Sequence, residues 1–120
     1  MLYALVGGLP DGWRPGGLGS GPGSADGDLR GAVTHVRDGD TIEVANTPVR
    51  IANLDCAERG DADGPRATAR MSELVARQEV VCDLEGRMSY DREVGTCALA
   101  LSGEDLGEIL IREGVCERWR

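Results

Sequence analysis

The chain has no lysine, no phenylalanine and a single histidine, which limits the chemistry open to it. All thirteen basic residues are arginine, and together with the abundance of alanine, glycine and valine we attribute this to genome composition. Against twenty-one acidic residues they leave a net charge of -8, so the chain lacks the positive excess by which proteins attract nucleic acid at long range. Any contact with phosphate must therefore be local, through a few well-placed arginines or a bound cation.

Zinc-binding spacings and long hydrophobic runs are also missing. The four cysteines include no Cys-x-x-Cys pair, and His35 has no second histidine beside it, which argues against a zinc site. We expect His35 to lie on the surface at a strand end. The apolar run LYALV near the start is too short to span a membrane and lacks the positive flank and cleavage pattern of a secretory signal. We therefore expect no stable membrane span.

The 120 residues suffice for one domain of ordinary size, and 41% of them are hydrophobic, as in a typical globular protein. Residues 1–30 are rich in glycine and proline, which predicts a flexible N-terminal segment. Such a segment would suit a tether to a membrane or a partner. Residues 31–120 form the predicted folded domain.

Two periodicities predict the fold. Apolar and polar residues alternate, as in strands, over five segments: 31–39, 41–46, 47–55, 79–85 and 95–103. Apolar residues at helical spacing predict a helix over residues 64–78, with Pro65 in its first turn. A second, shorter helix ends at Gly114. No strand-helix-strand unit recurs, so this order favours a small, partly open barrel of mainly β structure with helices over a parallel sheet.

Charged residues gather at the ends of these predicted strands. The DGDT stretch alone is a common turn signal, and its acids do not fit an EF-hand. The stretch VRIANLDCAE adds Arg50, Asp55 and Glu58 near one strand end, where a bulge would let them face a single site. Two aspartates from neighbouring strands, a backbone carbonyl and water suit a hard cation, of which Ca²⁺ is the natural occupant.

These residues resemble the staphylococcal-nuclease-like, or thermonuclease, family. The matching elements over residues 31–120 are VRDGDTIEV, VRIANLDCAE, a helix that opens GPRATAR, YDR before a strand, and SGEDLGEILIREG. The resemblance implies an α+β protein built on a five-stranded OB-fold barrel, with one helix between strands 3 and 4 and a second after strand 5. It also implies a Ca²⁺-dependent nuclease that hydrolyses the phosphodiester bonds of DNA or RNA with low sequence preference.

The resemblance assigns metal ligands and their supports. The carboxylates of Asp40 and Asp55 and the backbone carbonyl of Cys56 would bind Ca²⁺. Asp38 and Thr41 would support the metal loop without touching the ion.

The resemblance also assigns the residues that act on the phosphodiester. Arg50 would bind the phosphate, and Glu58 would act as general base or order the attacking water. This division is chemically sound, because hydrolysis of an anion requires both neutralised charge and a deprotonated water.

The chain departs from the family's pattern at two places. Cys56 and Ala57 replace Thr-Pro, which leaves the loop less constrained but keeps a backbone carbonyl ligand. The family's Tyr-Gly-Arg, whose arginine stabilises the transition state, is altered within SYDREVGTC. One alignment puts Gly95 at the arginine's position and is slightly favoured by the spacing to Gly103, whereas the other puts Arg92 there and needs a two-residue bulge.

Loss of that arginine would cost about 10² to 10³ in rate. The sequence therefore leaves two hypotheses besides a fully active nuclease. One is a weakened nuclease, and the other is a non-catalytic OB-fold module that binds an oligonucleotide or a protein.

The cysteines indicate two disulfides. Cys82 and Cys97 lie in consecutive strands joined by a turn, and relatives of the family often carry cysteines there. The family's barrel also brings the chain after the second helix beside the metal loop, which implies a bond between Cys56 and Cys116. Both bonds would indicate a periplasmic or secreted protein, whereas four reduced thiols would indicate a cytoplasmic one.

The remaining expectations concern Trp119 and the partners. Trp119 is expected to pack on the barrel, although its place between Arg118 and Arg120 would also suit stacking on a base. DNA or RNA is the expected substrate, and we expect the protein to be a monomer.

Overall fold

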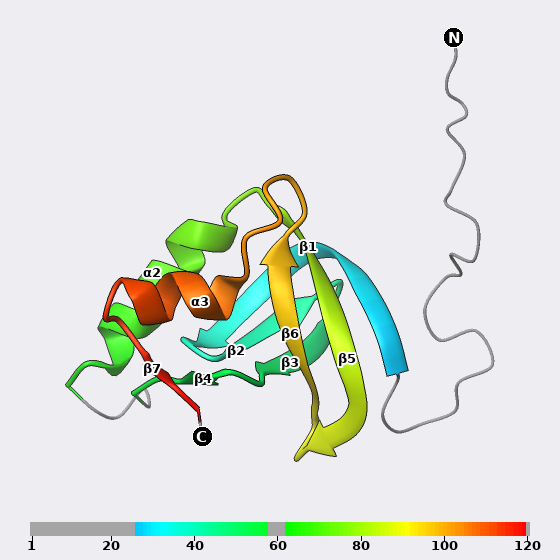
Figure 1. The fold of residues 1–120 in the computed structure, drawn as a ribbon, viewed down its shortest axis with the longest axis horizontal. Helices are drawn as coiled ribbons and strands as arrows, with labels where there is room; N and C mark the ends of the chain where they lie inside the picture. The colour runs from blue at the N-terminus through cyan, green and yellow to red at the C-terminus, as the bar shows by residue number, and fades with distance from the viewer. Residues whose placement is uncertain (1–25, 58–61, 120) are drawn as a thin grey trace, which may run out of the picture.

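Alternating apolar side chains line the inside of a closed five-stranded barrel in the computed structural model, which describes residues 26–57 and 62–119 (Figure 1). The strands follow one another around the barrel in the order β1-β2-β3-β6-β5. Their bounds are β1 Asp26–Asp38, β2 Thr41–Val44, β3 Thr47–Ile51, β5 Glu79–Ser89 and β6 Arg92–Leu99. The barrel and its two helices confirm the expected α+β, OB-like fold.

The barrel interior follows from the period of two along each strand. Ile42 and Val44 of β2 and Val49 and Ile51 of β3 are fully buried, whereas the residues between them are only partly covered. Ala45 and Asn46, with φ values of 47° and 68°, form the two-residue hairpin turn between these strands.

The barrel closes through a parallel seam between β3 and β6. All other neighbouring pairs in the barrel are antiparallel. Across the seam Arg50 is the partner of Val94, and Ile51 is the partner of Gly95. This pairing brings the end of β3 beside the start of β6, which lies more than forty residues later in the chain.

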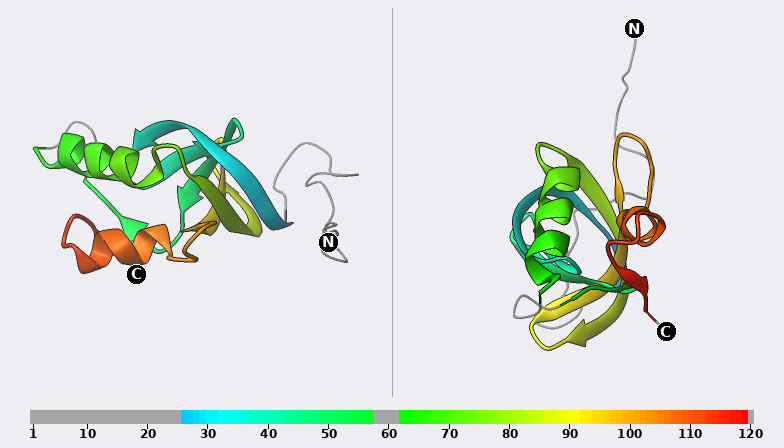
Figure 2. Two further views of the ribbon diagram at one scale, coloured as in Figure 1. Left: turned by 90° about the horizontal axis from the view of Figure 1, so that it is seen from above. Right: turned by 90° about the vertical axis from the view of Figure 1, so that its left-hand side faces the viewer.

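Two helices lie at one end of the barrel (Figures 1 and 2). Helix α2, Gly64–Val75, has Pro65 in its first turn and buries Ala67 and Met71. Helix α3, Leu106–Arg112, is capped by Asp105, whose carboxylate accepts a hydrogen bond of 2.9 Å from the N–H of Glu108. Within the described ranges, neither helix is long and apolar enough to cross a membrane.

The structure differs from the expected elements in three ways. The predicted strand 47–55 is divided by a turn into β3 and β4, Leu54–Asp55. Strand β4 pairs with β7, Glu117–Arg118, in a small separate sheet that the sequence did not indicate. Strand β1 begins inside the segment that was expected to be flexible up to residue 30, because residues 26–32 pair with β5.

Candidate active site

The charged residues singled out in the sequence converge on one pocket of about 500 Å³. It lies where the ends of β1, β3, β4, β5 and β6 approach the C-terminal residues. Its lining includes three aspartates, three arginines and two aromatic residues: Asp38, Asp40, Asp55, Arg50, Arg87, Arg92, Tyr90 and Trp119. The expected convergence of Asp40, Arg50 and Asp55 is thus present in the structure.

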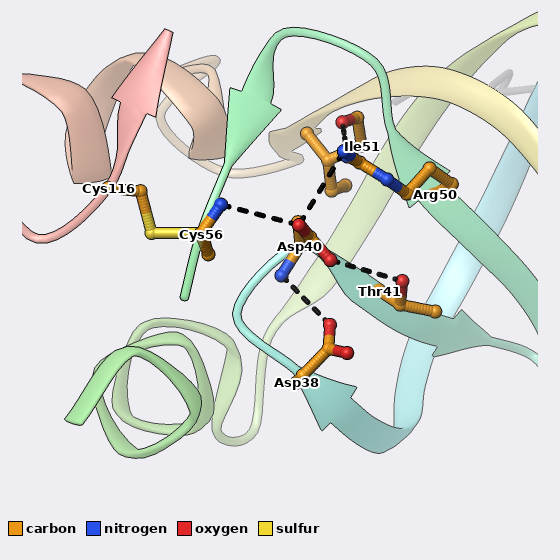
Figure 3. Close-up of a disulfide and its surroundings, with 7 residues drawn as sticks. All are labelled: Asp38, Asp40, Thr41, Arg50, Ile51, Cys56 and Cys116. Carbon is orange, nitrogen blue, oxygen red and sulfur yellow. Dashed lines mark hydrogen bonds and ion pairs between the residues drawn. A yellow bond between two sulfur atoms is a disulfide. The ribbon is translucent and has the colours of Figure 1, made fainter. Parts of the chain in front are cut away.

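Asp40 is held at the turn between β1 and β2 by backbone contacts on both sides (Figure 3). Its N–H donates to the Asp38 carboxylate at 3.2 Å, and its own carboxylate accepts from the N–H of Cys56 at 3.3 Å. Gly39 precedes it because a Cβ there would lie 2.8 Å from the Cβ of Ala67 on α2 and 2.9 Å from the sulfur of Cys56. The turn is therefore packed tightly against both.

Arg50 is the positive partner of Asp40. An Nη atom of Arg50 lies 3.6 Å from the Asp40 carboxylate, and both side chains are largely buried. Arg50 also donates a hydrogen bond to the carbonyl of Ile51. Because β3 is paired to β2 and β6, the arginine projects from a strand that is fixed on both edges.

Burial raises the pKa of Asp40 to about 6. The neighbouring carboxyl of Asp38 adds to the rise, while the charge of Arg50 and the N–H of Cys56 oppose it. One nearby arginine therefore does not compensate for the loss of water around this carboxylate. A site of this kind gains from a second cation.

Arg92 enters the same pocket from the start of β6. Its guanidinium donates to the hydroxyl of Thr41 at 3.0 Å, to the hydroxyl of Ser89 at 3.0 Å and to the carbonyl of Ser89 at 3.1 Å. The buried Thr41 hydroxyl in turn lies 3.4 Å from the Asp40 carboxylate. Thr41 thus links the acidic turn to the second arginine.

The two positions that the sequence offers for the family's second arginine, Gly95 and Arg92, have different surroundings in the structure. A Cβ at Gly95 would lie 2.5 Å from the carbonyl oxygen of Asp83, so no side chain fits there. The register of β5 and β6 shifts between Leu84 and Met88, where β5 has two more residues than β6. This irregularity corresponds to the two-residue bulge that the Arg92 alignment requires.

Two exposed aromatic rings complete the pocket lining. The Trp119 ring is 54% exposed and lies 5.4 Å from the guanidinium carbon of Arg50. Tyr90 is 93% exposed, and the centre of its ring lies 5.7 Å from the guanidinium carbon of Arg92. Both distances fit cation–π contacts. From the sequence, base stacking by Trp119 was only an alternative expectation. Tyr90 was not predicted, and its one signal was its position two residues before Arg92.

Oxygen donors for a divalent cation are present in this pocket. Asp38, Asp40 and Asp55 all line it, and carboxylate oxygens suit Ca²⁺. Among residues 26–57 and 62–119, no three histidine, cysteine or acidic side chains are close enough together to hold a metal. The described residues therefore form no metal site of three or more such side chains, and any cation in the pocket would need water for its remaining ligands. Glu58, the expected general base, lies outside the described residues.

Both expected disulfides are present. Cys82 and Cys97 are partners across β5 and β6, with their Cα atoms 4.0 Å apart. The bond between Cys56 and Cys116 links the residue directly after β4 to the C-terminal residues, and the two Cα atoms are 4.6 Å apart (Figure 3). All four cysteines are bonded, which is compatible with an oxidising compartment.

Comparison with known proteins gives relatives with nuclease names. No protein-family model matches the chain. It is 34% identical over 104 residues to a micrococcal nuclease of Shigella flexneri, covering 78% of this chain and 60% of that protein. It is 33% identical over 91 residues to an uncharacterized endonuclease of Escherichia coli O157:H7, covering 72% and 59%. Protein ParB of Escherichia coli is 37% identical over 73 residues, covering 58% and 41%.

The chain therefore spans at most about three fifths of the length of these curated relatives. The similarity extends over most of the folded domain, since the first two alignments cover more than 70% of the chain.

Proposed function

Because this chain belongs to the staphylococcal-nuclease-like family, we propose that it is a metal-dependent phosphodiesterase that hydrolyses DNA or RNA with low sequence preference. The observation that supports this most is the ion pair of buried Asp40 with Arg50 in a pocket that Asp55 and Arg92 also line. A phosphodiester anion needs cationic groups around its oxygens, and this pocket gathers them in a strongly acidic protein.

The metal of this proposal is Ca²⁺. Asp40, Asp55 and the backbone carbonyl of Cys56 would hold it, with Asp38 and Thr41 keeping Asp40 in place. When bound, it would supply positive charge to the phosphate oxygens and lower the pKa of a bound water. It would also relieve the unfavourable ionisation of Asp40.

The arginines have separate roles in the proposal. Arg50 binds a phosphate oxygen. The ion pair with Asp40 is long, with 3.6 Å between its nitrogen and oxygen, so the guanidinium can still donate to a substrate. Arg92, fixed by Thr41 and Ser89, is aimed into the pocket before substrate arrives and would stabilise charge in the transition state. Glu58 would take the proton of the attacking water, a role that follows from the family resemblance.

The local charge balance supports an anionic substrate. The three aspartates and three arginines of the pocket lining cancel, although the whole chain carries -8. With a divalent cation the pocket becomes positive, and it is then the part of the described surface best suited to a phosphate.

Cleavage of a fluorescently labelled single-stranded oligonucleotide and of plasmid DNA tests the proposal. We expect cleavage with Ca²⁺ and none with excess EDTA. We expect Arg50→Gln and Glu58→Gln to lower kcat by about 10² or more. Arg112→Gln, an exposed change outside the pocket lining, is the matched control and should leave kcat unchanged, while loss of activity in the two other variants would exclude a contaminating nuclease. Activity that survives Arg50→Gln and Glu58→Gln would refute the assignment.

The alternative function is an OB-fold module that binds an oligonucleotide without cutting it. The exposed rings of Tyr90 and Trp119 favour it, since stacking on such rings needs no catalysis. Saturable binding of the oligonucleotide with Ca²⁺, and no cleavage at high protein concentration, would support this alternative. We further propose that the protein acts as a monomer in the periplasm or outside the cell, a location that the two disulfides support.

A further inference from the structure

The C-terminal residues 116–119, called the C-terminal arm below, are fastened beside the pocket at three points. Cys116 is bonded to Cys56, and strand β7 of the arm pairs with β4. The N–H of Trp119 donates to the carbonyl of Asn53 at 3.0 Å. The disulfide is the one covalent link among these, and it joins residues sixty positions apart.

This fastening supports both charges at the centre of the pocket. At its far end the C-terminal arm lays the Trp119 ring against the guanidinium of Arg50. At the disulfide itself, the N–H of Cys56 donates to the Asp40 carboxylate, as Figure 3 shows. The same bond thus determines where Trp119 lies and how firmly the Cys56 peptide contacts Asp40.

The other contacts of the C-terminal arm are weak in comparison. Strands β4 and β7 have two residues each, too few to be stable as an independent pair. Arg118 forms a bidentate ion pair with Glu108 at 2.7 and 2.8 Å, but the two side chains are 55% and 44% exposed, so solvent weakens the pair. The position of the arm therefore depends mainly on the disulfide.

The two disulfides differ in their access to a reductant. Cys56 and Cys116, each 6% exposed, both line a hollow of about 440 Å³, whose charged lining is Arg66 and the three acids Asp55, Asp63 and Glu117. Cys82 and Cys97 are 0% and 1% exposed and lie between paired strands of the closed barrel. A reductant should reach the first bond well before the second.

We propose that the Cys56–Cys116 disulfide is a redox latch on the candidate active site, closed by oxidation and opened by a dithiol. One thiolate of the dithiol attacks a sulfur of the bond and forms a mixed disulfide. The second thiol then displaces the remaining cysteine, so that two electrons and two protons pass to Cys56 and Cys116 and the reductant leaves as its own disulfide. The C-terminal arm then separates, Trp119 leaves Arg50 and the Cys56 peptide no longer holds Asp40.

The latch rests on the proposed function in one respect, namely that the site it controls cleaves nucleic acid. Its consequence is an enzyme that is inactive among reducing thiols and becomes active in an oxidising compartment. A nuclease of low sequence preference would in this way be kept from the nucleic acid of the cell that makes it.

The first experiment needs no activity. Protein without metal is equilibrated with increasing dithiothreitol, alkylated and mapped by mass spectrometry. We expect Cys56 and Cys116 to be alkylated at a dithiothreitol concentration at least tenfold lower than Cys82 and Cys97. In a Trp13→Phe background, where Trp119 is the one tryptophan, its emission should shift to the red over the same range. Simultaneous reduction of the two bonds, or unchanged emission after reduction of the first, would overturn the latch.

The second experiment adds cleavage of the labelled oligonucleotide with Ca²⁺. We expect activity to fall at least tenfold as Cys56–Cys116 is reduced and to return on reoxidation. The double variant Cys56→Ser/Cys116→Ser should have low activity that dithiothreitol does not change, with circular dichroism confirming the barrel. Full activity of the reduced protein would refute the latch. Absence of cleavage by the oxidised protein would refute the proposed function instead, while the alkylation order and the Trp119 emission still decide whether the arm is released.

Discussion

Among single residues, Asp40 has the clearest electrostatic signature. Its pKa in the folded protein, about 6, lies above its ordinary value of 3.8, so the folded chain holds this proton more tightly than the unfolded chain does. This contribution to stability is complete below pH 3.8 and is lost as the pH rises through about 6. The free energy of unfolding of the metal-free protein should therefore decline over this range.

We expect Asp40→Asn to remove that decline, because asparagine cannot ionise. At pH 7 the metal-free variant should be more stable than the wild type by about 2 kcal/mol, taking ~1.4 kcal/mol per pKa unit and discounting for remaining solvent contact. Urea unfolding between pH 4 and 7 with EDTA measures this, with the exposed Asp28→Asn as control. Parallel pH profiles for wild type and Asp40→Asn would contradict the prediction.

Arg37 and Asp91 support the second arginine from a distance. Arg37 donates to both carboxylate oxygens of Asp91 at 3.0 and 3.2 Å and to Glu43 at 2.9 Å. These hydrogen bonds lower the pKa of Asp91, so the pair is charged at neutral pH. They join β1 and β2 to the turn that carries Tyr90 and Arg92.

We expect Asp91→Asn to lower kcat by about 3- to 10-fold, because a catalytic group that is free to shift loses effective positioning. The melting temperature should change little, since the pair is solvent-exposed. Kinetics of oligonucleotide cleavage and a thermal melt measure the two effects. Glu79→Gln, which breaks the exposed Arg30–Glu79 pair away from the pocket, is the matched control. Equal kcat values for the two variants would count against a positioning role.

The sequence predicted the central charged residues, offered base stacking by Trp119 only as an alternative and did not indicate Tyr90. Asp40 and Arg50 follow turn and strand signals whose geometry is local, so their convergence was foreseeable from the chain alone. Trp119 reaches Arg50 only because a disulfide and a two-residue sheet fold the C-terminal arm back, and neither is visible in local periodicity. Tyr90 lines the pocket from a turn in which its backbone adopts a φ of 57°, which the sequence does not indicate.

Among the strands, β6 shows how closely the barrel is packed. Gly95 leaves no space for a side chain, because a Cβ would lie 2.5 Å from the backbone oxygen of Asp83 and 3.1 Å from the Cα of Leu84. Both contacts are backbone atoms of β5, which cannot turn aside as a side chain can. Any larger residue must therefore separate the two strands.

We expect Gly95→Ala to destabilise the oxidised protein by about 1 to 3 kcal/mol. It should also lower activity, since Arg92 begins the same strand. Thermal unfolding and cleavage kinetics test this against Thr96→Ala, a partly buried neighbour where the change removes atoms. A Gly95→Ala protein as stable as the wild type would show that β5 and β6 are more loosely joined than the structure indicates.

The limits of sequence-based prediction are also clear in these strands. The alternation of apolar residues located all five barrel strands. It did not locate the division of 47–55 into β3 and β4, because the turn at residues 52–53 is set by the contact of Asn53 with Asp105 and Glu108 of the α3 region. Nor did it choose between Gly95 and Arg92, since a register shift is decided by the partner strand.

For the protein as a unit, the contrast between a net charge of -8 and a neutral pocket predicts a weak response to salt. Among the residues that the structure describes, Arg50, Arg87 and Arg92 are the arginines that line the pocket and could displace counterions from a bound strand. On single-stranded nucleic acid, each neutralised phosphate adds about -0.7 to the slope of log affinity against log salt concentration. With three arginines, the slope of log(1/KM) against log salt concentration should therefore be about -2. Arg87→Gln should reduce it by about 0.7 with kcat unchanged. Cleavage kinetics at fixed Ca²⁺ measure both, and a slope of about -5 would indicate a wider basic surface.

The parallel seam between β3 and β6 has a consequence for protein synthesis. That seam brings Arg50 and Arg92 to the same pocket, and it cannot form until β6 has emerged from the ribosome. A nascent chain that ends before residue 92 carries the acidic turn and Arg50 but no assembled pocket. Under the proposed function, the messenger RNA being translated would therefore meet no assembled pocket until β6 has been made.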